Sequence, residues 1–272
     1  MDATKYKEIE KELDSLINIG VKVSNNLAGT KVRHRSESYA DIIFTKLLSH
    51  AISLKKLSPS PKSSRSELWD YPSACSVARC IIEAYDVLEY IALSKISEVE
   101  KDFRILVWKL HDYHRRYSML EAIKSNMPQV ESIREDSDEL QTEVVLHRCF
   151  LRTKKDYQKR IRNGNAPSFL CSHKELNEKN GINHEYYTIV TMMLSQYVHT
   201  LPIAIHQLQY FKAGTSDAIH MSAMPIQYSL PFVARAISRM IEVFPGGSTN
   251  VGTEDIYQLK FWNLIAEKGF DS

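Results

Sequence analysis

Glycine and proline are scarce in this sequence, and their scarcity limits the number of turns that the chain can make. The 272 residues include nine of each, about 3 %, whereas globular proteins ordinarily contain about 7 % glycine and about 5 % proline. Apolar residues recur at intervals of three and four along most of the chain, which is the spacing of amphipathic helices. The sequence therefore predicts an all-α protein, a single bundle of about eight helices.

The whole chain, residues 1–272, is expected to form one helical domain. Its helical core should cover about residues 38–243, with peripheral helices at 4–19 and 253–267. Within that core, one expected helix ends near residue 57. Three more span about 72–93, 98–126 and 130–162, another begins near residue 184, and the last spans about 222–243. The Pro- and Ser-rich segment 57–65 is typical of a loop.

Composition excludes several classes of protein. A net charge of +2 does not demand a polyanionic partner, although clustered cations could still bind one. The four cysteines contain no C-x-x-C pair and are too few for a disulfide scaffold. The charged N-terminal segment lacks the apolar stretch of a secretory signal. We therefore expect reduced thiols and a cytoplasmic location.

Motifs of several enzyme classes are missing from the sequence. It contains no Walker A loop, no G-x-G-x-x-G, no G-x-S-x-G, no H-E-x-x-H and no Glu-x-x-His. His111 and His114 could share a metal from one helical face, but no further ligands accompany them at a suitable spacing. We therefore expect no metal and no cofactor.

Charge is unevenly distributed over the helix expected at 130–162. Six acidic residues and one basic residue lie between Glu131 and Glu143, whereas seven basic residues and one acidic residue lie between Arg148 and Arg162. This order would complement the dipole of one continuous helix. The alternative is a phosphate-binding patch, for which Arg152, Lys155 and Lys159 are candidates.

The segment 186–234 is almost uncharged, with Lys212 and Asp217 as its only formally charged residues. Its first part is long enough to cross a bilayer. Ser195, Gln196, His199 and Pro202 interrupt that part, which favours a helix packed inside a soluble bundle. A membrane partner is therefore not expected.

Polar side chains of this segment share one helical stripe. At 100° per residue, five of them fall within about 40° of Ser195. These five are Thr188, Thr191, His199, His206 and Gln209. A neutral polar stripe on an apolar helix indicates either a partly enclosed polar cleft or a satisfied structural network. Pro202 would displace His206 and Gln209 if it bends or ends the helix.

Two other helices carry candidate partners. Arg79, Glu83 and Asp86 fall within about 60° of one another on the helix at 72–93, as in a solvent-facing stripe. The alternative is that Arg79 and Glu83, four apart and able to pair, point into the same cleft as His199. On the helix at 98–126, three basic residues fall within about 40° as a solvated face or a nucleic-acid site. These three are Arg104, His111 and Arg115.

The sequence resembles a bacterial all-helical family of uncharacterised proteins over roughly residues 40–215. The resemblance rests on the pattern Arg79-x-x-x-Glu83-Ala84-Tyr85 and on the later run from Tyr187 through Leu194-Ser195-x-Tyr197-x-His199. In its general character this family is similar to HEPN-type helical domains, many of which are ribonucleases or RNA-binding partners in toxin and antiviral systems. This chain departs from them in having no Arg four to six residues before His199.

The resemblance implies a HEPN-like effector that acts on or binds RNA or a nucleotide in bacterial stress or phage defence, as a metal-independent ribonuclease if it is an enzyme. We expect Arg79, Glu83, Ser195 and His199 to form its cleft, with His199 as the acid–base group and Arg79 stabilising negative charge. The alternative is a non-catalytic interaction module with a structural polar cluster. A protein partner and a homodimer are left open.

Overall fold

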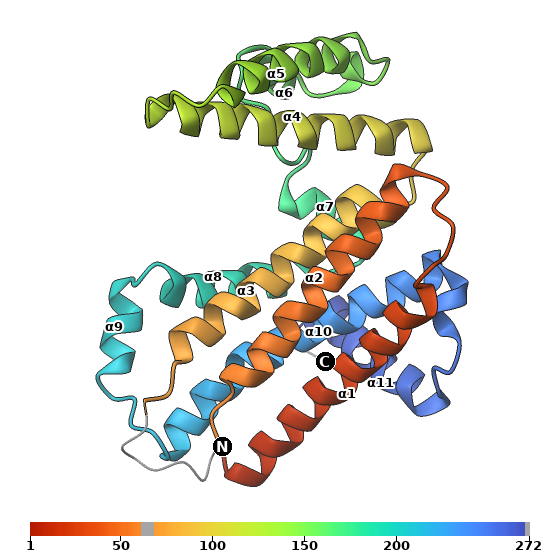
Figure 1. Ribbon diagram of the computed structural model, residues 1–272. Helices are drawn as coiled ribbons and strands as arrows, with labels where there is room; N and C mark the ends of the chain where they lie inside the picture. The colour runs from red at the N-terminus through yellow and green to blue at the C-terminus, as the bar shows by residue number, and fades with distance from the viewer. Residues whose placement is uncertain (61–67, 270–272) are drawn as a thin grey trace.

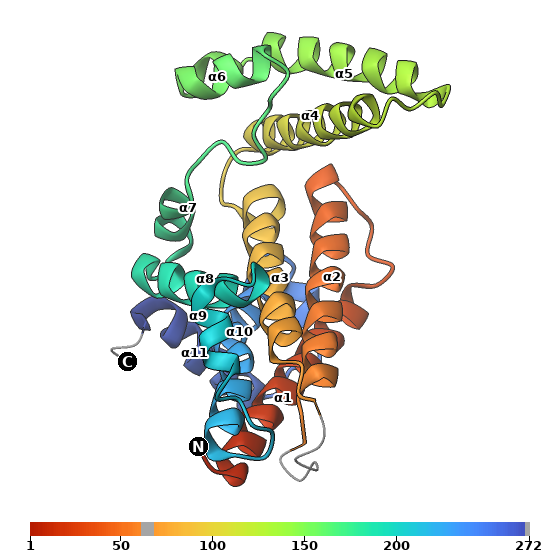
Figure 2. The same cartoon turned by 90° about the vertical axis from the view of Figure 1, so that its left-hand side faces the viewer.

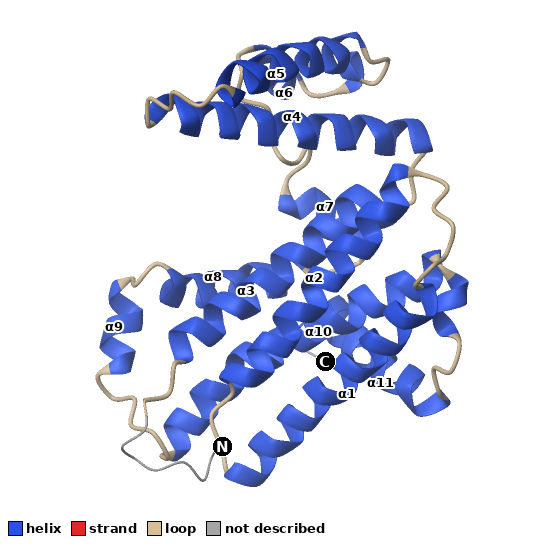
Figure 3. Cartoon of the chain, in the orientation of Figure 1, coloured by secondary structure: helices blue, strands red, loops and turns tan. Residues whose placement is uncertain are grey.

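The computed structural model describes residues 1–60 and 68–269, and within them it contains helices and no strand (Figures 1 and 3). The all-α class is confirmed, but the described residues form eleven α-helices where about eight were expected. They are α1 (Ala3–Leu27), α2 (Arg35–Leu57), α3 (Tyr71–Leu88), α4 (Glu98–Ala122), α5 (Gln129–Leu146), α6 (Lys155–Arg162), α7 (His173–Asn180), α8 (His184–Val198), α9 (Pro202–Leu208), α10 (Ser216–Val243) and α11 (Thr253–Lys268). The loop expected at 57–65 lies partly outside the described residues.

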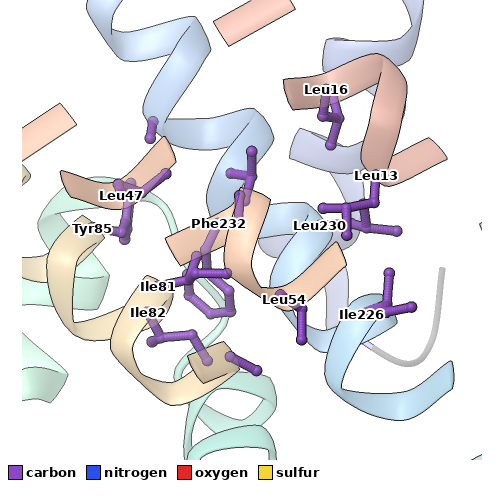
Figure 4. Packing of buried hydrophobic residues seen from close by; sticks show 14 of the residues in the cluster. Leu13, Leu16, Leu47, Leu54, Ile81, Ile82, Tyr85, Ile226, Leu230 and Phe232 are labelled. Carbon is purple, nitrogen blue, oxygen red and sulfur yellow. The ribbon is translucent and has the colours of Figure 1, made fainter. Parts of the chain in front are cut away.

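The largest apolar core lies between the long helices α1, α2, α3 and α10, with α8 and α11 packed against them (Figures 1 and 4). Its labelled side chains in Figure 4 are Leu13, Leu16, Leu47, Leu54, Ile81, Ile82, Tyr85, Ile226, Leu230 and Phe232. Burying apolar surface of this extent is the main force that holds the helices together. The N-terminal helix, expected at the periphery, contributes Leu13, Leu16 and Val23 to this core.

Helices α4, α5 and α6 form a separate layer at one end of the molecule, which we call the arm (Figures 1 and 2). The arm has its own apolar cluster, which includes Phe103, Leu110, Val144, Phe150 and Ile161. It is therefore held together by its own side chains, and it meets the main bundle both at the start of α4 and at mid-α4, where the rings of Trp108 and Tyr39 on α2 lie 5.4 Å apart.

The joint between arm and bundle is a short π-helical turn, Glu89–Leu93, that continues α3. Tyr90 in this turn is buried, and its hydroxyl accepts a hydrogen bond from the N–H of Leu170 (2.9 Å). The guanidinium of Arg104 on α4 lies 4.5 Å from the centre of the Tyr90 ring and donates to the Tyr90 carbonyl (3.1 Å). Tyr90 thus connects α3, α4 and the chain that enters α7.

The single helix expected over 130–162 is wrong, because the chain breaks into α5, a 3₁₀ turn at Phe150–Arg152, and α6. The break turns Phe150 into the arm's apolar cluster, where it is fully buried. The end of α6 returns to α5, where Gln141 donates to the Arg162 carbonyl (3.4 Å). The acidic and basic residues therefore do not complement the dipole of one helix.

The uncharged segment is also divided. α8 ends at Val198, and α9 starts at Pro202 with a bend of 72° between them, so His206 and Gln209 leave the stripe of Ser195. Among the described residues no single helix has the length and apolarity to cross a bilayer, and α8 and α9 pass that test only as a bent pair.

Gly20 lies where α1 packs closely against α2 and α10, so a Cβ added there would force the Leu48 side chain to move. A Cβ there would overlap the Leu48 methyl and lie 3.4 Å from Ile237. We predict that Gly20→Ala lowers the free energy of unfolding by about 1–2 kcal/mol, because overpacking outweighs the gain in helix propensity. Urea unfolding measures it, with Gly246→Ala as a neutral control, since a Cβ at Gly246 meets nothing within 4 Å.

A double-mutant cycle identifies the cause. Leu48→Ala should remove most of the cost of Gly20→Ala, because it removes the methyl that the new Cβ meets. An unchanged cost in that background would contradict the packing argument.

Candidate functional site

A buried carboxylate lies where α3 meets α7 and α8. Asp86, in the last turn of α3, is 1 % exposed. The hydroxyl of Tyr187, at the start of α8, donates a hydrogen bond of 2.6 Å to Asp86 Oδ2. A buried charge is tolerated only when it is paired or hydrogen-bonded, so this contact fixes both side chains.

His173 completes the group from the first position of α7. Its Nδ1 lies 3.4 Å from Asp86 Oδ2 and 3.0 Å from the Tyr187 oxygen, yet half of its side chain is exposed. A capping box between Ser172 and Glu175 fixes the start of α7 and so the place of His173. With Nδ1 held in this way, Nε2 has no partner within residues 1–60 and 68–269.

Arg79 and Glu83, two turns and one turn before Asp86 respectively, form an ion pair of 2.9 Å on α3. Their charges are near enough to influence the pKa of both His173 and Tyr187. Arg79 Nη1 and Asp86 Oδ1 are buried with no hydrogen-bond partner in the described part of the chain. We call Arg79, Glu83, Asp86, His173 and Tyr187 the Asp86 cluster.

The electrostatics of the cluster set the protonation of its two rings. The hydrogen bond to Asp86 raises the pKa of His173 above its ordinary value, although partial burial works against the rise. Burial and the neighbouring Asp86 raise the pKa of Tyr187, so its hydroxyl stays protonated and donates. The arrangement is one in which an acid orients an imidazole whose other nitrogen is free to exchange a proton.

Aromatic rings flank the imidazole. The Tyr187 ring stacks on it at 5.5 Å between centroids, and Phe169 lies at 5.8 Å. Phe169 in turn contacts Tyr90 at the joint of the arm, at 4.8 Å. These rings hold the orientation of His173 on the side away from solvent.

The structure separates Ser195 and His199 from this group. α8 runs antiparallel to α3, because Tyr187 meets Asp86 at one end while Tyr197 meets Tyr71 at the other, with ring centroids 4.5 Å apart. His199 is therefore exposed at the C-cap of α8, near the beginning of α3. Among the described residues no contact joins Ser195 or His199 to Arg79 or Glu83, and the histidine within reach of Arg79 is His173.

The other members of the polar stripe bond to their own helix. Thr191 donates to the Tyr187 carbonyl and Thr188 to the His184 carbonyl, each at 2.8 Å. The hydroxyls of Thr188 and Thr191 are therefore satisfied within α8 and do not contribute to a cleft with α3. His173 and Tyr187 were not among the site residues predicted from the sequence. The Ser172-x-x-Glu175 capping signal was the available indication that His173 begins a helix.

The basic residues of the arm have different roles. Arg104 is buried and donates to Glu100 (2.9 Å) as well as to Tyr90. Arg115 is exposed on α4, Arg152 is exposed in the connection between α5 and α6, and Lys155 and Lys159 are exposed on α6. The Arg104 guanidinium is therefore bound to groups within the protein, and the other four cations face solvent.

His111 and His114 hold the backbone of one residue. His111 Nδ1 lies 2.7 Å from the Ala166 carbonyl, and His114 Nδ1 accepts from the Ala166 N–H at 3.1 Å. They fasten the chain between α6 and α7 to α4. Where the structure describes side chains, no three His, Cys, Asp or Glu residues gather in a way that could hold a metal ion.

Comparison with known proteins gives a family without an assigned activity. The model of a family described as a family of unknown function (DUF5677) matches residues 41–219, more than half of the chain. No curated protein and no solved structure matches. Any function must therefore be argued from the site itself.

The contact between Asp86 and His173 predicts the direction in which the titration midpoint of the His173 imidazole is shifted. Nuclear magnetic resonance of the imidazoles should give His173 a midpoint above about 6.5, and Asp86→Asn should lower it, because the amide does not stabilise the imidazolium. The midpoint of His50, which burial and Lys46 lower, should not move. Equal His173 midpoints in the two proteins would contradict the pairing.

The same shift predicts a pH dependence of stability. Because the folded-state pKa of His173 is raised, its contribution is fully present below the unfolded pKa of about 6.5 and is lost as the pH rises through the folded value. The free-energy difference between wild type and His173→Gln should therefore be larger at pH 5 than at pH 9. A free-energy difference that does not change with pH would show that Asp86 does not stabilise the charged form of His173.

Proposed function

The chain belongs to the family of unknown function DUF5677, and we propose from its own residues that it acts on or binds RNA or a nucleotide at the Asp86 cluster. The observation that carries the proposal is the half-exposed His173, whose Nδ1 lies 3.4 Å from buried Asp86. This replaces His199 with His173 as the acid–base group. The resemblance to HEPN-type domains supports the same class of ligand, a cytoplasmic setting and a role in bacterial stress or phage defence.

Each group has a defined chemical role in the proposal. Asp86 and Tyr187 hold Nδ1, which leaves Nε2 of His173 to take a proton from a ribose 2′-hydroxyl as its oxygen attacks phosphorus. The same nitrogen returns the proton to the 5′-oxygen when the P–O5′ bond breaks. Arg79 stabilises the negative charge that develops on the phosphoryl oxygens, and Glu83 positions its guanidinium.

Cations of the arm reach α7, on the side of this helix that lies away from the Asp86 cluster. Lys154 pairs with Glu175 at 2.6 Å, which joins the basic segment 148–162 to the helix that begins with His173. Exposed lysine and arginine side chains attract the phosphates of a nucleic acid without reading its sequence. This proximity supports RNA or a nucleotide as the ligand.

A second candidate function rests on the same hydrogen bonds. Tyr187, Asp86 and His173 come from three helices, so the cluster ties α7 to α3 and α8 whether or not it performs chemistry. A non-catalytic module that binds a protein through its surface would need no more than this. The two candidates differ in whether His173 is needed for an activity or for stability alone.

RNA turnover by the purified protein separates the candidates. We expect His173→Ala to lower the cleavage rate at least about 100-fold, the usual contribution of a general acid–base group. His199→Ala is the matched control and should leave the rate within about twofold, because His199 lies exposed at the far end of α8. Melting temperatures of both variants show whether the proteins are folded.

Two results would overturn the catalytic proposal. One is a wild-type protein that neither cleaves nor binds RNA or nucleotides, with His173→Ala lowering only the melting temperature. The other is loss of cleavage in His199→Ala with normal cleavage in His173→Ala. The first result supports the non-catalytic module, and the second returns the acid–base role to His199.

A further inference from the structure

A cavity of about 600 Å³ lies between the arm and α7, outside the Asp86 cluster. Its walls come from the start of α4, the connection between α5 and α6, and the exposed side of α7. Glu175 and Lys179, one turn apart on α7, line it, whereas His173 contacts Asp86 on α3. The cavity and the Asp86 cluster are therefore separate sites on either side of one short helix.

The walls of this cavity carry an excess of positive charge. Five lysine and arginine residues and two glutamates line it. Both glutamates are already paired within the wall, Glu100 with Arg104 at 2.9 Å and Glu175 with Lys154 at 2.6 Å. Lys154 and the amide of Ser172 hold the pKa of Glu175 down at about 2, so this carboxylate is ionised and neutralises Lys154.

Three cations of the wall remain without a counter-charge. Arg148, Arg152 and Lys179 form no ion pair within residues 1–60 and 68–269, and all three are exposed. Arg148 and Arg152 belong to the arm, and Lys179 belongs to α7, so the charges face one hollow from two sides. Like charges arranged in this way repel one another until an anion enters between them.

We propose that this cavity binds a compact ligand with several phosphate groups, such as a nucleoside triphosphate or an inorganic polyphosphate. Guanidinium groups match phosphate oxygens in pairs, and lysine adds a point charge. The volume lies within the range of ordinary small-molecule sites. Val99, Phe103 and Leu170 supply apolar parts of the lining, and the two arginines and Lys179 supply its uncompensated positive charge.

The set of cations that line the cavity favours a small ligand over a nucleic-acid strand. The neighbouring cations Lys155 and Lys159 lie on α6 and do not line the cavity. A strand that follows the basic segment would use them, whereas a ligand inside the cavity would not. Because its contacts come from both the arm and α7, the ligand would also hold the arm to the bundle.

Binding of ATP and of inorganic tripolyphosphate to the full chain, measured by calorimetry, tests the proposal. We expect both probes to bind and to raise the melting temperature, and AMP and inorganic phosphate to bind at least about tenfold more weakly. Arg148→Glu/Arg152→Glu should weaken binding of both strong probes at least about tenfold. Lys155→Glu/Lys159→Glu, with the same change of charge outside the cavity, should change it less than about twofold.

Lys179→Gln keeps the test decisive if the double arginine variant does not fold. This exposed residue lies on the opposite wall, and its loss should weaken tripolyphosphate binding while leaving the melting temperature of the free protein unchanged. Equal losses in the α6 control would show diffuse surface attraction and overturn the proposal. Failure of ATP and tripolyphosphate to bind the wild type at millimolar concentration would overturn it as well, whatever the result for RNA cleavage.

Discussion

Two carboxylates at the C-terminal end of α3 are buried, Asp86 in its last turn and Glu89 at the start of the π-helical turn that follows, and the need to compensate them organises the surrounding helices. Asp86 and Glu89 are each 1 % exposed and lie three residues apart. An uncompensated buried charge costs several kcal/mol, so each requires a partner from another part of the chain. Tyr187 and His173 supply it for Asp86, and Arg239 of α10 supplies it for Glu89 through a 2.8 Å bond from Nε. Burial still raises the pKa of Glu89, against the opposing effect of Arg239.

The position of the arm follows from the same end of α3. Glu89 begins the π-helical turn, and Arg239 also donates to the Leu93 carbonyl (2.7 Å) at the end of that turn. Tyr90 between them receives Arg104 from α4 and the Leu170 N–H from the chain before α7. The joint that holds the arm is therefore tied to the buried charges, and the basic cavity lies beside it with Tyr90 in its wall.

Sequence periodicity gave the helical class and the direction of side chains within each helix. It placed Arg79, Glu83 and Asp86 on one side of α3, and Arg79 and Glu83 do pair. It could not give the antiparallel register of α8 on α3, which decides that Tyr187 rather than His199 lies beside Asp86. Register depends on long-range packing that a helical wheel does not contain.

The break after α5 could not be predicted from the sequence, for a related reason. The acidic and basic halves of 130–162 are compatible with one helix, and the burial of Phe150 in the arm decides against it. Buried Arg104 likewise resembled a solvated cation, because the carbonyl of Tyr90 that it contacts belongs to another helix. His173 was overlooked since its acidic partner lies 87 positions earlier in the sequence, at Asp86.

The coupling between Asp86 and His173 in RNA turnover tests the central claim most directly. Cleavage rates of wild type, Asp86→Asn, His173→Gln and the double variant form a closed cycle, with unfolding free energies measured on the same four proteins. If Asp86 acts through the imidazole, Asp86→Asn slows the wild type and has no further effect once His173 is replaced. Independent effects that multiply in the double variant would contradict the account.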